Sequence, residues 1–314
     1  MKEGKMIRAR QMNVLIMIAI IVGICIPLFF TAVQTGVFAK EPVVEARQEV
    51  TDENAPVLRV AVDDGFCPMS FYDADGNLSG LNVELITMVA NQLGMRLEFE
   101  CGDWMTCRQN LEEGKADVIL GLETFSNMQH VLKTVPVTTD QLNVYGENKI
   151  ESIGSLANKK VAVMARSVIM TIFDLQCEYV EYNTNSEILK AVENGEVDYG
   201  ICHAAVAEKI IEKENLSVVS SLTIMNSFLT FGVREDKEEL RDQMNTILKY
   251  YANQGTLANL KNKWIVNYSR NRSLSYVMEQ NKVFYVAYLI TWLFVMLLLI
   301  ILKADYSRKQ HYIE

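Results

Sequence analysis

The chain has 314 residues, which leaves room for two domains, and 50% of them are hydrophobic, which is enough for a substantial core. Charged residues make up only 22%, a low share that two long apolar runs near the ends explain. The formal net charge of -9 disfavours nucleic acid as a partner.

The first apolar run, residues 12–34, is long enough to cross a hydrocarbon core, which takes ~20 residues. Basic residues precede it within residues 1–11, and such residues tend to stay in the cytoplasm. We therefore expect a transmembrane helix or uncleaved signal anchor with a cytoplasmic amino terminus. A cleavable signal peptide is the alternative, because Val37-Phe38-Ala39 could serve as a processing site.

Residues 35–56 are acidic in their second part, contain two prolines and lack an apolar period, which predicts a linker. The folded domain begins at Val57 with a short strand. Asp75-Gly76 then signals a hairpin, and residues 81–93 carry apolar residues at helical spacing up to a glycine, which predicts a helix. A second helix is expected from Trp104 to Glu113.

The stretch from Ala116 to Pro136 begins as a buried strand and gives way to a polar turn. Ligands of open α/β sheets bind where such strands end. We therefore expect Thr124, Ser126 and Gln129 to point hydrogen-bonding groups into a cleft. The alternative is that Ser126 only caps a following helical turn.

A weak internal duplication divides the domain, because residues 113–117 before one predicted strand resemble residues 194–198 before another. Two similar α/β lobes are therefore expected, with the chain crossing between them twice. The predicted boundaries are residues 57–142 plus 228–267 for lobe 1 and residues 143–227 for lobe 2. A cleft between two such lobes is the usual place for a small ligand, and the lobes can hinge.

Lobe 2 shows alternating strand and helix patterns. The predicted strands cover residues 160–164, 178–182 and 197–202, and a predicted helix covers residues 186–193. Ser167 is expected to cap a helix that runs to Leu175. After a strand that returns to lobe 1, the pattern is helical from Lys237 to Trp264, with an interruption at Gly255.

The second apolar run, residues 283–302, carries tyrosines and a tryptophan toward its outer half and is followed by basic residues. It predicts a transmembrane helix, preceded by a juxtamembrane connection over residues 268–282 and followed by a short cytoplasmic tail over residues 303–314. Both termini are then cytoplasmic, and the domain between the spans is extracytoplasmic. Because the tail is short, we expect a kinase or cyclase output module to belong to a partner or to have been lost.

Six short motifs occur in order outside the apolar runs. They are Phe66-Cys67-Pro68, Asp75-Gly76 with Gly80 and Glu84, Gly114-Lys115-Ala116-Asp117-Val118, Ser155-Leu156-Ala157-Asn158-Lys159-Lys160-Val161, Gly195-x-x-Asp198, and Gly255-Thr256-Leu257 with Trp264. Through them the region from Val57 to Trp264 resembles the type II periplasmic binding proteins of solute-binding protein family 3, the amino-acid-binding class. The resemblance implies an α/β, two-lobed periplasmic-binding-protein type II fold with a central cleft, here flanked by two transmembrane helices.

The resemblance also implies a set of ligand-binding residues. Phe66 matches the aromatic residue that covers the ligand, and Thr124 and Ser126 match a hydroxyl pair beside it. Relatives then carry an arginine that grips the α-carboxylate of the ligand, where this chain has Gln129. Glutamine cannot supply that paired charge.

On lobe 2 the resemblance places His203 where relatives carry the acid for the α-amino group, and Arg166 where they carry a glycine before Ser167. Both ends of an amino-acid grip are therefore altered, which predicts a different ligand or a lost one. Arg166 and His203 would suit an anionic solute, with Gln129 and Ser126 opposite, whereas Glu123 could attract a cation. Alternatively, Arg166 is solvated and His203 caps the end of a strand.

Cys101 and Cys107 flank a turn and could form a disulfide in an oxidising compartment. The sequence has no CxxC pair for zinc, no phosphate-binding glycine loop and no turn typical of a catalytic nucleophile. We therefore expect a binding protein without a cofactor and not an enzyme.

The expected function is that of a membrane-anchored extracytoplasmic sensor. It would bind a small solute, an amino acid or small organic acid, between its lobes and signal through its transmembrane helices to a partner. Two alternatives stay open: the substrate-binding component of an amino-acid-type ABC importer, which would deliver its solute to a permease, and a ligand-free degenerate interaction domain.

Overall fold

The computed structural model describes residues 2–34, 50, 52–267 and 281–311 and divides into two compact units. The helix-pair unit combines Met1–Lys40 with Arg270–Glu314, and the α/β unit spans Glu41–Ser269. The expected processing site Val37-Phe38-Ala39 lies outside the described residues, as do most of the predicted linker and of the juxtamembrane connection.

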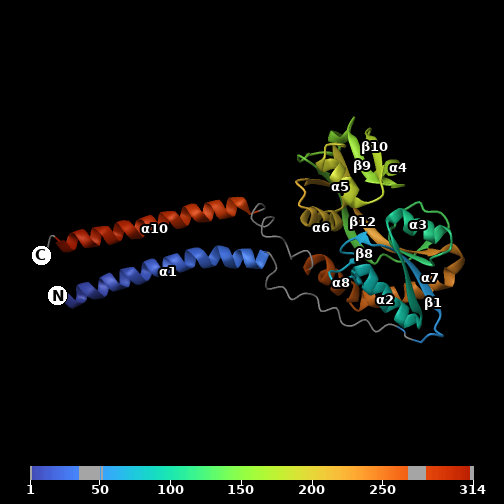
Figure 1. Ribbon diagram of the computed structural model, residues 1–314, viewed down its shortest axis with the longest axis horizontal. Coiled ribbons are helices and arrows are strands. Elements are labelled where there is room, and N and C mark those ends of the chain that lie inside the picture. Colours follow the sequence, from blue (N-terminus) through green and yellow to red (C-terminus); the bar gives the residue numbers. More distant parts are fainter. Residues whose placement is uncertain (1, 35–49, 51, 268–280, 312–314) are drawn as a thin grey trace. The chain divides into compact units, whose positions relative to one another are not determined.

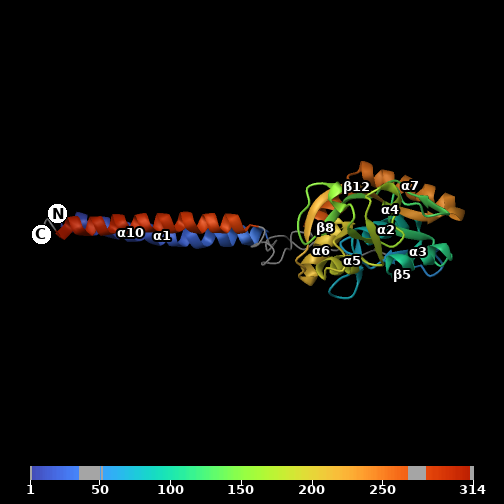
Figure 2. The ribbon, with the colours of Figure 1, turned by 90° about the horizontal axis from the view of Figure 1, so that it is seen from above.

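The helix-pair unit consists of α1 (Lys2–Gln34) and α10 (Lys282–His311), which run alongside each other with both chain ends at the same end of the pair (Figures 1 and 2). The Trp292 indole occupies the space that a side chain at Gly23 would need, and its Nε1–H donates to the carbonyl of Ala19 at 3.1 Å. The stretches Asn13–Val33 and Lys282–Ala304 are long and apolar enough to cross a membrane, judged by length and composition alone.

The α/β unit is built on one mixed nine-stranded sheet, with strand order β10-β9-β11-β8-β12-β6-β1-β5 and β7 paired to β12. Its strands are β1 (Val57–Asp63), β5 (Arg96–Gly102), β6 (Val118–Glu123), β7 (Val131–Lys133), β8 (Thr138–Gly146), β9 (Lys160–Met164), β10 (Glu178–Tyr182), β11 (Tyr199–His203) and β12 (Val219–Arg234). A small second sheet contains β2 (Gly65–Phe66), β3 (Ser70–Tyr72) and β4 (Leu78–Ser79).

Helices cover both faces of the large sheet. They are α2 (Leu81–Leu93), α3 (Trp104–Glu112), α4 (Ile169–Ile172), α5 (Asn185–Glu193), α6 (Ala204–Glu214), α7 (Glu238–Asn253) and α8 (Thr256–Lys261). Three short turns, η1 (Ile153–Leu156), η2 (Glu235–Lys237) and the π-helical η3 (Asn262–Asn267), complete the regular structure that is described.

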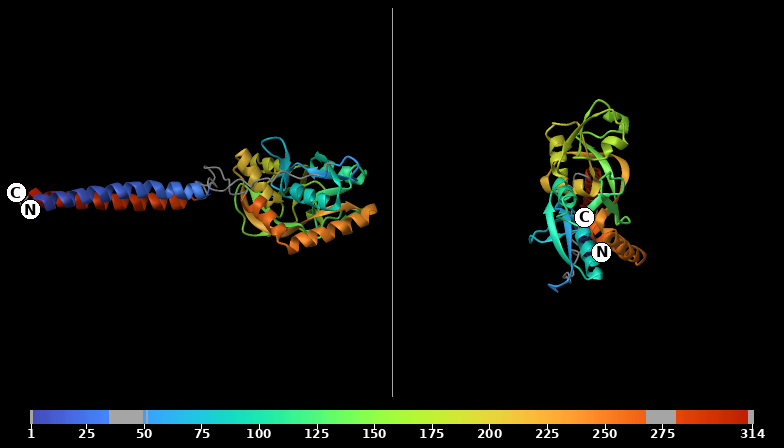
Figure 3. Two further views of the ribbon diagram at one scale, coloured as in Figure 1. Left: turned by 90° about the horizontal axis from the view of Figure 1, so that it is seen from below. Right: turned by 90° about the vertical axis from the view of Figure 1, so that its right-hand side faces the viewer.

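The chain forms two lobes joined by the long strands β8 and β12, which pair with each other in the middle of the sheet. Lobe 1 packs α2, α3, α7 and α8 around β5, β1 and β6, and lobe 2 packs α4, α5 and α6 around β9, β10 and β11 (Figure 1; Figure 3, right). Each lobe has an apolar core on both faces of its part of the sheet. The predicted two-lobed α/β fold is confirmed.

Two local interpretations of the sequence are wrong, the helical turn after Ser126 and the length of the helix after Ser167. No helical turn follows Ser126, whose Oγ instead accepts the N–H of Met128 at 3.4 Å in a turn that leads to β7. The helix expected from Ser167 to Leu175 is the single turn α4, because the backbone is already extended at Phe173. In addition, helix α6, which was not predicted, follows β11 directly.

The possible disulfide is not formed, because Cys101 and Cys107 are both free. Cys101 on β5 faces the core that α2 and α7 cover, whereas Cys107 on α3 is fully buried in the core on the opposite face of the sheet. The two thiols therefore point to different sides of one sheet, and burial raises the pKa of Cys107.

Candidate ligand-binding site

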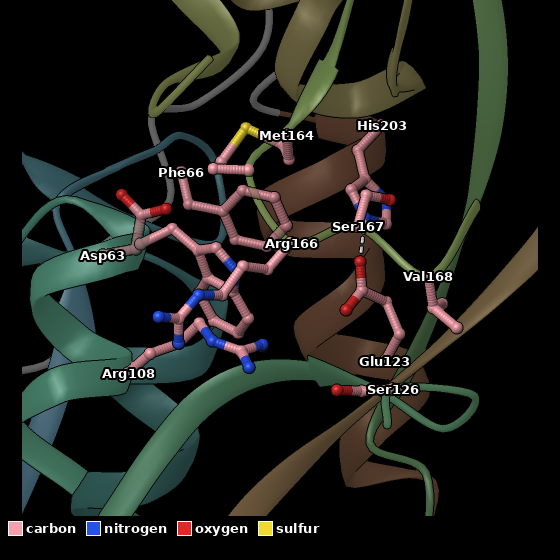
Figure 4. A pocket seen from close by; sticks show the side chains of 13 residues that line it. Asp63, Phe66, Arg108, Glu123, Ser126, Met164, Arg166, Ser167, Val168 and His203 are labelled. Atoms are coloured by element: carbon pink, nitrogen blue, oxygen red, sulfur yellow. Dashed lines mark hydrogen bonds and ion pairs between the residues drawn. The ribbon is translucent and has the colours of Figure 1, made fainter. Parts of the chain in front are cut away.

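The described residues form a pocket between the two lobes, to which both contribute side chains (Figure 4). Lobe 1 supplies Asp63, Phe66, Trp104, Arg108, Gly121, Glu123 and Ser126, and lobe 2 supplies Met164, Ala165, Arg166, Ser167, Val168 and His203. The empty space measures about 520 Å³ including its mouth, but only about 40 Å³ can hold the centre of a water molecule. A cavity needs roughly 10–15 Å³ to hold one water, so the pocket between the closed lobes has room for a small group only.

Phe66 closes one wall of the pocket. It lies on β2 just after β1, is 7% exposed, and meets the imidazole of His203 edge to face with ring centroids 5.4 Å apart. Gly121 permits this position, since a β-carbon there would lie 3.2 Å from the ring and the backbone φ of +76° favours glycine. The ring thus bridges from lobe 1 to the end of β11 in lobe 2.

His203 sits between two carboxylates. Its Nε2 lies 3.5 Å from Glu123 Oε1 at the end of β6, and its Nδ1 lies 3.7 Å from Asp140 Oδ2 on β8. Burial alone would lower the pKa of His203, but the bond to Glu123 and the charge of Asp140 outweigh burial and raise it. The geometry therefore favours an imidazolium that joins lobe 2 to lobe 1.

Two arginines enter the pocket from opposite lobes. Arg108 on α3 is 6% exposed, and its buried Nε has no hydrogen-bond partner among the described residues. Arg166 follows β9 with a φ of 57°, and its backbone N–H donates to Glu181 at 2.7 Å. The Arg166 guanidinium lies 3.8 Å from Glu112 of α3, which gives a second link between the lobes.

Asp63 ends β1 at the rim of the same pocket. Its Oδ1 accepts the N–H of Gly65 at 3.0 Å, which favours the charged form. Burial outweighs that bond and, with added repulsion from Asp64 and Asp103, raises the pKa of Asp63 to about 7. The carboxyl group is therefore close to half protonated at neutral pH.

Five of the seven residues expected at the site line the pocket, namely Phe66, Ser126, Arg166, Ser167 and His203. The structure does not bring Thr124 and Gln129 to it. Gln129 is exposed and its Nε2 donates to the carbonyl of Asn127 at 2.9 Å, while the N–H of Thr124 donates to Phe228 of β12. Neither residue lines the pocket.

Sequence reasoning missed Asp63, Trp104 and Arg108. Asp63 could have been found, because it ends a predicted strand at the edge where ligands bind. Trp104 and Arg108 are four residues apart on one helix and so share a face. Among the described residues no group of three or more His, Cys, Asp or Glu side chains could hold a metal ion.

Known proteins are similar to this chain in sequence or in fold. A probable amino-acid ABC transporter-binding protein of Haemophilus influenzae is 31% identical over 45% of this chain and 57% of its own length. The L-cystine-binding protein TcyA of Bacillus subtilis is 25% identical over 66% of this chain and 81% of its own length.

Among solved structures, a histidine kinase sensor domain with similarity to periplasmic binding proteins matches with a TM-score of 0.62 at 22% identity, covering 67% of this chain and 96% of that domain. This likeness shows a shared fold. The family model of bacterial extracellular solute-binding proteins, family 3, matches residues 58–267, which is most of the chain and nearly all of the α/β unit that is described. The chain therefore belongs to the bacterial extracellular solute-binding proteins, family 3.

Proposed function

We propose that the chain is a membrane-anchored extracytoplasmic sensor that binds a small solute between its lobes and signals through its two apolar helices. The observation that carries the proposal is the pocket, because its lining comes from both lobes and contacts cross it. A solute that adds contacts to both walls would stabilise the closed arrangement over an open one. Differential affinity of this kind is what a ligand needs in order to shift a conformational equilibrium.

Two charged pairs cross the pocket, and they differ in burial. The bond from His203 to Glu123 is long at 3.5 Å, and the Arg166 to Glu112 pair at 3.8 Å joins two side chains that are 57% and 45% exposed. Exposed pairs contribute only ~0–1 kcal/mol. The exposed Arg166–Glu112 pair therefore adds little to closure, whereas opening the lobes must break the buried His203–Glu123 pair.

Support for membrane anchoring comes from α1 and α10, each with a stretch of the length and composition that crosses a membrane. Basic residues lie in the sequence before α1's apolar stretch and after that of α10, which favours both termini in the cytoplasm and the α/β unit outside. Contacts such as Trp292 with Gly23 join the two helices, so that a displacement of one helix bears on the other. We propose that lobe closure reaches a cytoplasmic partner by this route.

The solute is an amino acid or a small organic acid in this proposal, and the protein is a binder and not an enzyme. Amino-acid binding is what the names of both curated relatives state for those proteins. The name of the Haemophilus influenzae relative, an ABC transporter-binding protein, favours a second candidate, the binding component of an ABC importer that delivers its solute to a permease. A ligand-free interaction domain would be the outcome if no solute is found.

Thermal unfolding of the full chain in detergent micelles tests solute binding. Amino acids, small organic acids and peptidoglycan fragments are added one at a time, and we expect at least one class to raise the melting temperature. Absence of any shift across the panel would contradict the proposal. Purification from membranes after cross-linking then separates the two candidates, since recovery of a permease supports the importer and recovery of a kinase or cyclase supports the sensor.

A further inference from the structure

Arg108 is a buried arginine whose guanidinium is only partly compensated, by the charges of Glu112 and Glu123. Its side chain is 6% exposed, and its Nε has no hydrogen-bond partner in the parts of the chain that are described. A buried guanidinium without a partner is costly, and the cost falls when an anion binds it. Trp104 and Arg108 are one helical turn apart on α3 and both line the pocket. The guanidinium of Arg108 points into it (Figure 4).

Arg166 approaches the same region from lobe 2. Its φ of 57° is uncommon for a residue with a β-carbon, and the bond from its N–H to Glu181 holds the loop in that conformation. Its one ion pair, to Glu112 at 3.8 Å, is too long for a good hydrogen bond and is exposed to solvent. Most donors of this guanidinium are therefore available to a ligand.

The space beside the two arginines matches a small oxyanion. The cavity there has a volume of about 40 Å³, which leaves room for a small polar group. A guanidinium presents paired N–H donors in the planar geometry that a carboxylate accepts. The hydroxyl groups of Ser126 and Ser167 lie on the same pocket lining and can donate further hydrogen bonds.

Two acidic residues, Asp63 and Glu123, line the pocket as well, and the repulsion that each would exert on a bound anion is reduced. Glu123 is engaged by the imidazole of His203 at 3.5 Å. Burial raises the pKa of Asp63 to about 7, so much of that group is neutral at neutral pH. The positive charge of the pocket therefore lies at His203, which Glu123 and Asp140 face, and at Arg108 and Arg166, beside which lies the single carboxylate of Glu112.

We infer that Arg108 and Arg166 together form an oxyanion-binding site that grips the carboxylate of the solute from both lobes. The inference rests on the proposed function and deepens it by naming the chemical class of the solute. Since one guanidinium comes from each lobe, an anion held by both also joins the lobes. Relatives carry a single carboxylate-binding arginine where this chain has Gln129. In this chain two arginines at other positions, Arg108 and Arg166, would take over that role.

Calorimetric titration of the full chain in detergent micelles tests this site. The probes are acetate and succinate, with acetamide and succinamide as uncharged counterparts of the same shape, and inorganic phosphate as a second oxyanion. We expect the acids to bind at least tenfold more tightly than the amides. Tighter binding of phosphate than of either acid would support the oxyanion site but assign it to phosphate-bearing solutes.

Arg108→Gln and Arg166→Gln should each weaken binding of the better oxyanion roughly 10- to 100-fold, as expected for loss of charge-assisted hydrogen bonds. Arg241→Gln on α7 is the matched control, because Arg241 pairs with Glu238 and Asp242 away from the pocket, and it should leave binding unchanged. If Arg108→Gln does not fold, Arg108→Lys keeps the charge but loses the paired donors and should still weaken binding.

Equal binding of acids and amides would overturn the inference, as would arginine variants that bind the oxyanions as the unaltered chain does. If no oxyanion binds but a neutral or cationic member of the solute panel raises the melting temperature, the oxyanion site is wrong and the proposed function stands. If nothing in either panel binds, both are wrong.

Discussion

Asp63 offers a quantitative test of how the pocket is built. Folding raises the pKa of its carboxyl group from an ordinary value of 3.8 to about 7, chiefly through burial. The folded state therefore holds a proton that the unfolded state loses at lower pH, and the free energy of unfolding must fall as the pH rises from about 4 to about 7. A shift of this size corresponds to at most ~4 kcal/mol.

Asp63→Asn removes the free-energy cost of burying a charged carboxylate, because asparagine stays neutral. Its side-chain carbonyl can still accept the N–H of Gly65. Asp63 retains some exposed surface at the rim of the pocket, so we expect about half of the upper limit, ~2 kcal/mol of added stability at about pH 8. At about pH 5 the gain should be smaller, because the folded protein then keeps its proton.

Urea unfolding of the full chain in detergent, followed by tryptophan fluorescence at both pH values, measures this difference. Asp174→Asn is the control, since Asp174 is exposed in lobe 2, and it should change stability little at either pH. A destabilised Asp63→Asn variant at the higher pH, or a gain that is the same at both, would refute the burial argument.

Three further changes test other parts of the structure. Phe66→Ala should abolish any solute-induced rise in melting temperature, because the ring forms a wall of the pocket; an unchanged response would remove Phe66 from the site. Glu84→Ala should lower the free energy of unfolding by ~2 kcal/mol in urea titration, since Glu84 accepts the indole N–H of Trp264 at 2.6 Å, and a loss near zero would contradict this. Gly23→Leu should separate α1 from α10, because the Trp292 indole fills the space beside Gly23; spin-label distances between the helices in micelles would then increase, and unchanged distances would count against the packing.

Elements with a strong local signal were predicted closely. Helix α2 begins and ends where its apolar spacing indicated, and Gly94 closes it with a left-handed φ of 65°. The alternative in which Ser126 caps a helical turn is wrong, and a serine before a polar turn accepts a backbone N–H equally well in a helix cap and in a non-helical turn. Only the pairing of β7 with β12, which is distant in sequence, decides between the two.

The site was predictable in part for the same reason. Phe66, Arg166 and His203 stand at positions that the family resemblance marks, so the pocket could be approached from the sequence. Arg108 could not be recognised, because an arginine on an amphipathic helix ordinarily faces solvent, and only the packing of α3 against the sheet buries it. The possible disulfide between Cys101 and Cys107 was wrong for a similar reason, since proximity in sequence does not tell which face of a sheet each thiol lies on.

The central claim is that a solute draws the two lobes together. The distance between spectroscopic probes at the exposed positions Glu178 on β10 and Lys249 on α7, incorporated as non-natural amino acids in the full chain, measures lobe separation directly. We predict that a saturating solute shortens this distance and narrows its distribution. A solute that binds but leaves the distribution unchanged would contradict the account.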